Sequence, residues 1–278
     1  MVKQLNFPNS TLDLSSPQVM GILNVTPDSF SDGGKFTHLQ TALSQAEDMI
    51  AAGATIIDIG GESTRPGAEE VSEADELERV IPVLKAIKQK FDVLVSIDTS
   101  KAAVMKAAIE NGADLINDVR ALQNKDCLAI LASSDVPICL MHMQGLPRTM
   151  QNEPSYNNVI DDIVLFFEQR IQACIDAGIA RERLILDPGF GFGKTLEQNF
   201  HLLANLSAFA KLKCPILAGI SRKSMIGNLL NRDVKQRLAG SLSAAIIAAQ
   251  QGAQIIRVHD VQETVDALTI LKAVADNQ

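Results

Sequence analysis

The chain has 278 residues, 46% hydrophobic and 21% charged, with a formal net charge of −8. Such a composition is that of a folded globular protein, and its acidic balance argues against a nucleic-acid-binding surface. No run approaches 18 apolar residues and the N-terminus lacks the apolar core of a signal peptide, so we expect a soluble, cytoplasmic protein without a membrane partner. The four cysteines are widely spaced, which predicts buried thiols rather than disulfides or a zinc site.

The chain begins with two short alternating stretches, QLNF and TLDL, which predict a hairpin over residues 3–14 with its turn at Asn9-Ser10. After them, apolar runs alternate with helical patterns as far as the C-terminus. The runs that predict strands are residues 19–25, 55–60, 93–97, 115–118, 137–143, 184–187, 215–220 and 255–259. The helical patterns cover residues 37–52, 72–90, a stretch ending at 109, 125–132, 155–177, 196–206, a region within 221–251, and 261–275.

Eight strand–helix units without a break in composition predict a single (β/α)₈ TIM barrel. We therefore divide the chain into an N-terminal hairpin extension, residues 1–16, and a barrel, residues 17–278. The competing architecture is an open, doubly wound sheet, which typically carries a GxGxxG motif after its first strand. This chain reads Asn24-Val25-Thr26-Pro27 at that position, so the barrel is favoured.

Polar residues stand at the C-terminal ends of the predicted strands, where the active sites of such barrels lie. Their burial is costly unless they meet a polar ligand, so their convergence on one rim indicates a site. They are Asn24, Glu62, Asp98, Asn117, Asp118, His142, Asp187, Ser221, Arg257 and His259. Arg257 and His259 alternate along the last strand and are expected to face the same side, where an anion such as phosphate would fit.

Several of these residues have a structural alternative. Asp98 suits a cap of the helix that follows it, and Asp187 stands before a Pro-Gly turn. Asn117 and Asp118 point to opposite faces, and the pattern does not decide which of them faces the site. His142 points away from the two methionines that flank it, and we interpret it as structural.

The loops after four strands also suggest ligand contacts. Residues 189–195, GFGFGKT, lack the first glycine of a P-loop, and we interpret them as a close backbone approach to a flat ligand that Phe192 covers. Ser221-Arg222-Lys223-Ser224 opens a helix and places two cations beside its positive end. Residues 26–34 and 62–67 are longer than typical βα loops, which favours lids over the strand ends.

These motifs closely resemble those of the dihydropteroate synthase family. They are NVTPDSFSDGG at 24–34, GGESTRPG at 60–67, SIDT at 96–99, ND at 117–118, DPGFGFGK at 187–194, SRKS at 221–224 and RVHD at 257–260. The resemblance runs from about residue 17 to the end. It implies a homodimeric transferase of folate biosynthesis that condenses 6-hydroxymethyl-7,8-dihydropterin diphosphate with 4-aminobenzoate, releases diphosphate, and is a target of sulfonamides.

Carried over residue by residue, the resemblance implies three subsites. The pterin would contact Asp98, Asn117, Met141, Asp187, Phe192, Gly219 and Lys223. The diphosphate would contact Asn24, Thr64, Arg65, Arg257 and His259, opposite the pterin-binding carboxylates, with Mg²⁺ bound at Asn24. Aminobenzoate would contact Phe30, Pro66, Phe190 and Ser221. The catalytic residues would be Asp98, Asp187, Lys223, Arg257 and His259.

The implied chemistry agrees with these residue types. The reacting CH₂ is attached to an electron-rich ring, so an SN1-like departure of diphosphate, assisted by Mg²⁺, is favoured, and no covalent nucleophile is needed. A pterin-binding methyltransferase would share the barrel but would bind no diphosphate, so the SRKS segment and the Arg257/His259 pair argue against it. A non-catalytic paralogue is expected to have lost some of the polar strand-end residues, and all are present.

Overall fold

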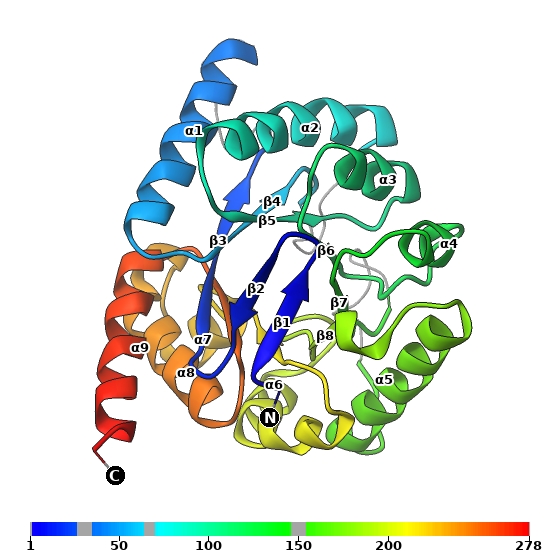
Figure 1. Ribbon diagram of the computed structural model, residues 1–278. Helices are drawn as coiled ribbons and strands as arrows, with labels where there is room; N and C mark the ends of the chain where they lie inside the picture. Colours follow the sequence, from blue (N-terminus) through cyan, green and yellow to red (C-terminus); the bar gives the residue numbers. More distant parts are fainter. Residues whose placement is uncertain (1, 27–34, 64–69, 146–153, 278) are drawn as a thin grey trace.

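The computed structural model describes residues 2–26, 35–63, 70–145 and 154–277, and in them eight parallel strands form a barrel (Figure 1). The strands are β3 (Gln18–Asn24), β4 (Ile56–Gly60), β5 (Leu94–Asp98), β6 (Leu115–Asp118), β7 (Ile138–Met141), β8 (Leu184–Asp187), β9 (Leu217–Ala218) and β10 (Ile255–Val258). Their order is β8-β7-β6-β5-β4-β3-β10-β9, and a parallel bridge between Leu186 and Ile216 joins the two ends. The predicted (β/α)₈ barrel is confirmed.

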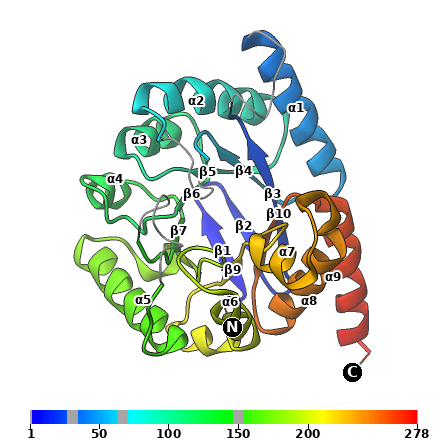
Figure 2. The ribbon, with the colours of Figure 1, turned by 180° about the vertical axis from the view of Figure 1, so that it is seen from behind.

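Helices surround the barrel, as the two opposite views show (Figures 1 and 2). They are α1 (Lys35–Ala51), α2 (Glu73–Lys90), α3 (Ala102–Glu110), α4 (Cys127–Ala132), α5 (Val159–Asp176), α6 (Leu196–Ala204), α7 (Ser224–Leu230), α8 (Leu238–Gln250) and α9 (Val261–Ala275), with 3₁₀ turns η2 (Arg181–Arg183), η3 (Leu206–Leu212) and η4 (Val234–Gln236). The predicted helical region at 221–251 is two helices, because Asn231 adopts a left-handed conformation that ends α7. Among the helices described, none is long and apolar enough to cross a membrane.

Side chains along the strands alternate between two separate hydrophobic layers, because successive residues of a strand point to opposite faces. One set, including Ile57, Ile97 and Leu140, packs between the barrel and its helices. The other set lies inside the barrel near its N-terminal end and consists of Met20, Ile56, Leu115, Cys139, Ile185, Leu217 and Ile255. The inner set forms an apolar floor.

The N-terminal hairpin covers this floor. Strands β1 (Gln4–Phe7) and β2 (Ser10–Asp13) pair antiparallel, with Phe7 opposite Ser10, so the turn is Pro8-Asn9, one residue earlier than predicted. Leu5, Phe7 and Leu14 are buried against the inner apolar set. The hairpin therefore lies across the N-terminal end of the barrel, as Figure 1 shows, and the opposite end is where polar groups can meet a ligand.

The four cysteines are free and buried, as predicted. Burial raises the pKa of the Cys127 thiol to about 12, and those of Cys174 and Cys214 to about 11. Burial also raises the pKa of Cys139 well above its ordinary value. All four are therefore protonated at neutral pH and poor nucleophiles.

Candidate active site

Above the apolar floor, the interior of the barrel becomes polar. Asp58, Asn117, Asp187 and Arg257 each stand two residues beyond a member of the floor on the same strand, so they share its inward face. Met141 follows Cys139 in the same way and is buried. Asn117, and not Asp118, therefore faces the interior, which decides between the two alternatives that the sequence left open.

Arg257 crosses the interior from β10 and is bound by two carboxylates. Its Nε donates to Asp58 Oδ2 at 2.6 Å, and its Nη2 donates to Asp98 Oδ2 at 2.8 Å. Burial alone would lower the pKa of Arg257, but the charges of Asp58 and Asp98 outweigh it and raise that pKa. The sequence placed Arg257 opposite the carboxylates, whereas in the structure it is paired with them.

Asp98 ends β5 and points into the site, so the alternative that it caps the next helix is wrong. Helix α3 begins at Ala102 with Lys101 as its N-cap, and no side chain caps it. Burial raises the pKa of Asp98 to about 7, Arg257 opposes this, and Asp58 adds to it. Asp98 therefore changes its charge close to neutral pH.

Asp187 and Lys223 carry opposite charges and act on each other electrostatically. Asp187 Oδ1 accepts a hydrogen bond from Gly189 N at 2.8 Å, and burial raises the pKa of this carboxyl although Lys223 opposes the change. Lys223 Nζ donates to the backbone oxygen of Phe190 and lies 4.4 Å from the ring centre of Phe192. Burial lowers the pKa of Lys223 to about 8, with Asp187 acting against it.

Gly219 lies between the two charged pairs. A Cβ at Gly219 would stand 3.9 Å from Arg257 Cδ and 3.9 Å from Asp187 Oδ2. A side chain at this position would stand between the guanidinium and the carboxylate, and the place of Gly219 in the pterin pocket stays a prediction.

Ser221, His259 and Asn24 lie around the mouth. Ser221 Oγ is 3.1 Å from His259 Nδ1 and accepts from His259 N at 3.2 Å. Asn24 is the last residue of β3 and pairs with Gly60 in the barrel register. If Gly60 carried a Cβ, that atom would lie 3.5 Å from Asn24 Oδ1 and 3.8 Å from Asp98 Cβ. Asn24 and Asp98 therefore lie on either side of this glycine.

Arg222 and Lys223 both lie at the start of α7, as predicted, and Arg222 is paired with a carboxylate of the chain itself. Its Nε donates to Asp260 Oδ2 at 2.9 Å, and its backbone N donates to Ser241 Oγ at 2.9 Å. These contacts attach the β9–α7 loop to the segment after β10 and to α8. Lys223, the N-cap of α7, is the cation of this segment that faces Asp187.

Gly189 and Gly193 allow a close approach between two loops of the chain itself, and the predicted approach of this segment to a flat ligand stays a prediction. A Cβ on Gly189 would lie 1.9 Å from His142 O, and one on Gly193 would lie 2.4 Å from Gln144 O. Lys194 fastens this loop by donating to the oxygens of Gly189 and Phe192 at 2.8 and 3.1 Å. Lys194 also contacts His142, whose Nδ1 lies 3.0 Å from Lys194 Nζ.

His142 and Asp118 have structural roles. The buried ring of His142 packs against that of Phe166, with 4.9 Å between the two ring centres. Burial lowers the pKa of His142 to about 2, so the imidazole remains neutral. Asp118 accepts hydrogen bonds from Arg120 N at 2.8 Å and Leu122 N at 2.7 Å, which organises the turn after β6.

Five residues predicted to contact a substrate are not part of this polar cluster as the structure describes it. Phe30, Thr64, Arg65 and Pro66, and most of both predicted lids, lie outside the described residues. The side chain of Phe190 is fully buried in the outer hydrophobic layer, so a contact with aminobenzoate needs this ring to move. The role of these five residues stays a prediction.

Asp58 is the functional-site residue that the sequence reasoning missed. Its side chain is 0% exposed, and besides Arg257 it accepts a hydrogen bond from Asn117 Nδ2 at 3.2 Å. The available signal was a single carboxylate inside the apolar strand IIDIG, where an unpaired charge would be costly.

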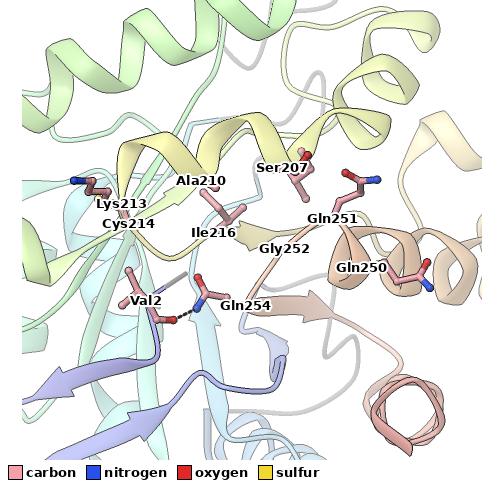
Figure 3. Close-up of a pocket in the computed structure, with 11 residues that line it drawn as sticks. Val2, Ser207, Ala210, Lys213, Cys214, Ile216, Gln250, Gln251, Gly252 and Gln254 are labelled. Carbon is pink, nitrogen blue, oxygen red and sulfur yellow. Dashed lines mark hydrogen bonds between the residues drawn. The ribbon is translucent and has the colours of Figure 1, made fainter. Parts of the chain in front are cut away.

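Cavities of the described chain lie at both ends of the barrel. One of about 340 Å³ lies at the C-terminal end, beside Arg120 and Met143. Another, of about 450 Å³, lies at the N-terminal end between η3 and the end of α8 (Figure 3). Its lining includes Lys213, Cys214 and Gln254, and none of the charged residues that meet around Arg257.

Comparisons with known proteins agree with this geometry. A family model described as pterin binding enzyme matches residues 20–259. Dihydropteroate synthase from Haemophilus influenzae is 55% identical over 96% of this chain and 98% of its own. The structure of the Yersinia pestis enzyme in a sulfonamide drug complex matches with a TM-score of 0.94 and 57% identity over 98% of this chain and 99% of its own.

A structure of dihydropteroate synthase from Xanthomonas albilineans with 4-aminobenzoic acid matches with a TM-score of 0.93 and 46% identity, covering 99% of both chains. The span of the family match includes every described residue of the polar cluster, and the two structural matches cover 98% and 99% of this chain. The chain is a transferase that belongs to the dihydropteroate synthase family of pterin-binding enzymes.

Proposed function

We propose that this protein condenses 6-hydroxymethyl-7,8-dihydropterin diphosphate with 4-aminobenzoate to form dihydropteroate. The observation that carries the proposal is the cluster of Asp98, Asn117, Asp187, Lys223 and Arg257 in the mouth of a barrel that shares its family with enzymes of this activity. The arylamine nitrogen forms a bond to the CH₂ carbon, the carbon–oxygen bond to diphosphate breaks with its electron pair, and the amine loses a proton to solvent.

The pterin ring fits the interior of the cluster. A pterin has alternating hydrogen-bond donors and acceptors along one edge, which buried carboxylates, an amide and an ammonium group can satisfy together. Asp98, Asn117 and Asp187 supply the acceptors, and Lys223 supplies a donor for the ring heteroatoms. Met141, Phe192 and Gly219 complete the slot. The carboxylates also favour positive charge on the ring as diphosphate departs.

The diphosphate is assigned to Arg257, His259 and Asn24 at the mouth. Three inward-facing carboxylates, Asp58, Asp98 and Asp187, face two cations, Lys223 and Arg257, so the described cluster alone does not attract an anion. A bound Mg²⁺ would supply the missing positive charge for the leaving group.

The donor set fits Mg²⁺ in one particular way. Among the described residues, no three His, Cys, Asp or Glu side chains form a metal-binding group. Mg²⁺ often takes only one or two protein oxygens and completes its shell with phosphate oxygens and water. Asn24 Oδ1, at the mouth, suits that arrangement, so we assign the metal to Asn24 together with the diphosphate.

Aminobenzoate is assigned to the outer side of the pterin, near Ser221. The Ser221 hydroxyl lies at the mouth next to His259 and offers a hydrogen bond to a carboxylate. The structure of the Xanthomonas albilineans relative contains 4-aminobenzoic acid and that of the Yersinia pestis relative is a sulfonamide drug complex, which supports 4-aminobenzoate as the substrate and sulfonamides as inhibitors.

Mixing the protein with the pterin diphosphate, 4-aminobenzoate and Mg²⁺ is expected to release diphosphate, which a coupled colorimetric assay detects. Chelating the metal with EDTA should abolish the release, and adding excess Mg²⁺ should restore it. A methyltransferase would instead move a methyl group from methyltetrahydrofolate and release no diphosphate. Absence of release in the complete mixture would refute the proposed reaction, and release unaffected by EDTA would refute the metal.

We also propose that two copies of the chain form a dimer through α7, α8 and α9. Helices α7, α8 and α9 are neighbours (Figure 2), and exposed apolar side chains lie on them and on η4: Leu229, Leu230, Val234, Ile247, Ile270 and Val274. A group of exposed apolar side chains on neighbouring helices is typical of an interface, and a second copy offers the same surface in return.

Leu229→Lys combined with Ile247→Lys is expected to convert the dimer to a monomer in sedimentation velocity, because both exposed side chains would place a charge in the interface. Leu165→Lys is the matched control, since Leu165 is 53% exposed on α5 and Leu229 is 58% exposed on α7. A wild-type protein that sediments as a monomer contradicts the dimer.

A further inference from the structure

Asp58 occupies an unfavourable position for a charge. It lies in the middle of β4, opposite Ile22 on one neighbouring strand and Ser96 on the other, and it has no exposed surface. Moving a carboxylate from water into such a position costs several kcal/mol even after the protein relaxes. The two atoms that compensate are Arg257 Nε and Asn117 Nδ2, and both donate to Oδ2. Asp58 Oδ1 has no partner among the described residues.

The two carboxylates that share Arg257 lie at different depths. Asp58 pairs with Ser96 in the barrel register, and Asp98 is two residues further toward the mouth, about 6–7 Å along the strand. The side chain of Asp98 is 12% exposed and that of Asp58 is 0% exposed. A ligand that enters from the mouth therefore reaches Asp98 first and has no access to Asp58.

Asp98 therefore has two competing partners. In the structure it accepts from Arg257 Nη2, and in the proposed reaction it accepts from the pterin. If Asp98 were the sole anchor of Arg257, each pterin that bound would displace the guanidinium from a buried ion pair. Asp58 removes this conflict, because its bond to Nε remains when the bond to Nη2 breaks.

We propose that Asp58 is a positioning residue that anchors Arg257, so that Asp98 can be transferred from the guanidinium to the pterin while Arg257 stays in the site. The inference rests on the proposed function and assigns a role to a residue that touches neither substrate. Without the charge of Asp58, Arg257 would place its whole donor edge on Asp98 as a bidentate pair, which is among the strongest side-chain interactions. The pterin would then have to compete with Arg257 for Asp98.

The test uses a pterin that lacks the diphosphate, 6-hydroxymethylpterin, with affinity measured by calorimetry. Asp58→Asn is expected to bind this ring about tenfold more weakly than the wild type. The amide is nearly isosteric and its oxygen can still accept from Asn117 Nδ2, so the variant should fold, as a thermal melt will verify. Ser96→Ala is the matched control: it removes a buried side chain at the same level whose Oγ has no partner in the described chain, and should leave the affinity unchanged.

A double variant separates positioning from a merely structural role. Adding Arg257→Gln to Asp58→Asn removes the guanidinium that captures Asp98, so the ring affinity should recover to that of Arg257→Gln alone. Lost packing would not recover on adding a second substitution. Ring affinity in Asp58→Asn equal to wild type, or a double variant as weak as Asp58→Asn, overturns the inference.

The pH dependence of ring binding gives an independent readout. Burial raises the pKa of Asp98, Arg257 lowers it, and the charges of Asp58, Glu76 and Asp118 raise it further. Lys223 also faces Asp98, and Asp58→Asn does not change its charge. Asp58→Asn removes the negative charge of Asp58 and leaves Arg257 paired with Asp98 alone, and both changes lower the pKa of Asp98. The loss of ring affinity on acidification should therefore begin at a lower pH in Asp58→Asn than in the wild type. An unchanged pH profile also overturns the inference.

Failure of the wild type to release diphosphate would instead refute the reaction and leave these ring-binding comparisons valid.

Discussion

Arg257→Ala is expected to lower the turnover of the pterin diphosphate by roughly 100- to 1,000-fold, the usual cost of removing one donor that stabilises charge developing in a transition state. The guanidinium is the central cation of the described cluster, and its Nη1 donates to none of the described residues, so it remains for the leaving diphosphate. Initial rates of diphosphate release at saturating substrate measure the effect on kcat.

The same substitution should also destabilise the fold, because it leaves Asp58 and Asp98 without their cation. Removing one partner of a buried ion pair typically costs about 3–5 kcal/mol, which urea denaturation measures. Arg257→Lys is the control: it keeps a positive charge, but an ammonium lacks the planar fork that bonds two carboxylates at once, so its turnover should be intermediate. Near-wild-type turnover by Arg257→Ala would contradict the assignment of β10 to the diphosphate.

The barrel was predictable because its strands are apolar runs that recur along the chain and alternate with helical patterns. Parallel strands in a barrel are buried on both faces, however, and a run such as IIDIG therefore does not reveal which residues point inward. That is why Asp58 was missed and why Asn117 could not be separated from Asp118. Only the register between strands, which depends on closure of the barrel, decides the inward face.

Contacts between distant segments were the other limit of the sequence. The pattern predicted the hairpin but not that Leu5 and Phe7 would cover the floor of the barrel. It predicted cations at 222 and 223, but the pairing of Arg222 with Asp260 joins residues 38 positions apart. Local periodicity carries no information about such pairs, so residue types at strand ends were predictable and their partners were not.

Asp187→Asn is expected to weaken the binding of 6-hydroxymethylpterin by roughly tenfold to 100-fold, since a hydrogen bond to a charged group contributes about 1.5–3 kcal/mol. The carboxylate offers only acceptors, whereas an amide would present a donor toward the donors of the ring. The fold should survive, because the amide oxygen can still accept the 2.8 Å hydrogen bond from Gly189 N. Isothermal calorimetry measures the affinity directly.

The charge of Asp187 also acts through Lys223, which gives the prediction a second, pH-dependent part. Burial lowers the pKa of Lys223 to about 8, and Asp187 is the group that raises it most. Without that carboxylate the pKa falls further, so the ammonium that donates to the pterin is lost at a lower pH than in the wild type. The decline of pterin affinity toward alkaline pH should therefore begin earlier in Asp187→Asn.

Asp118→Asn is the matched control for both parts. Asp118 is also a buried aspartate at the end of a barrel strand, but its bonds go to Arg120 N and Leu122 N on the outer side. Its substitution should reduce the free energy of unfolding and leave pterin affinity and its alkaline limb unchanged. If Asp187→Asn bound the pterin as tightly as the wild type does, Asp187 could not be a pterin-binding residue. Pterin binding is the only contact with a ligand that we assign to this carboxylate.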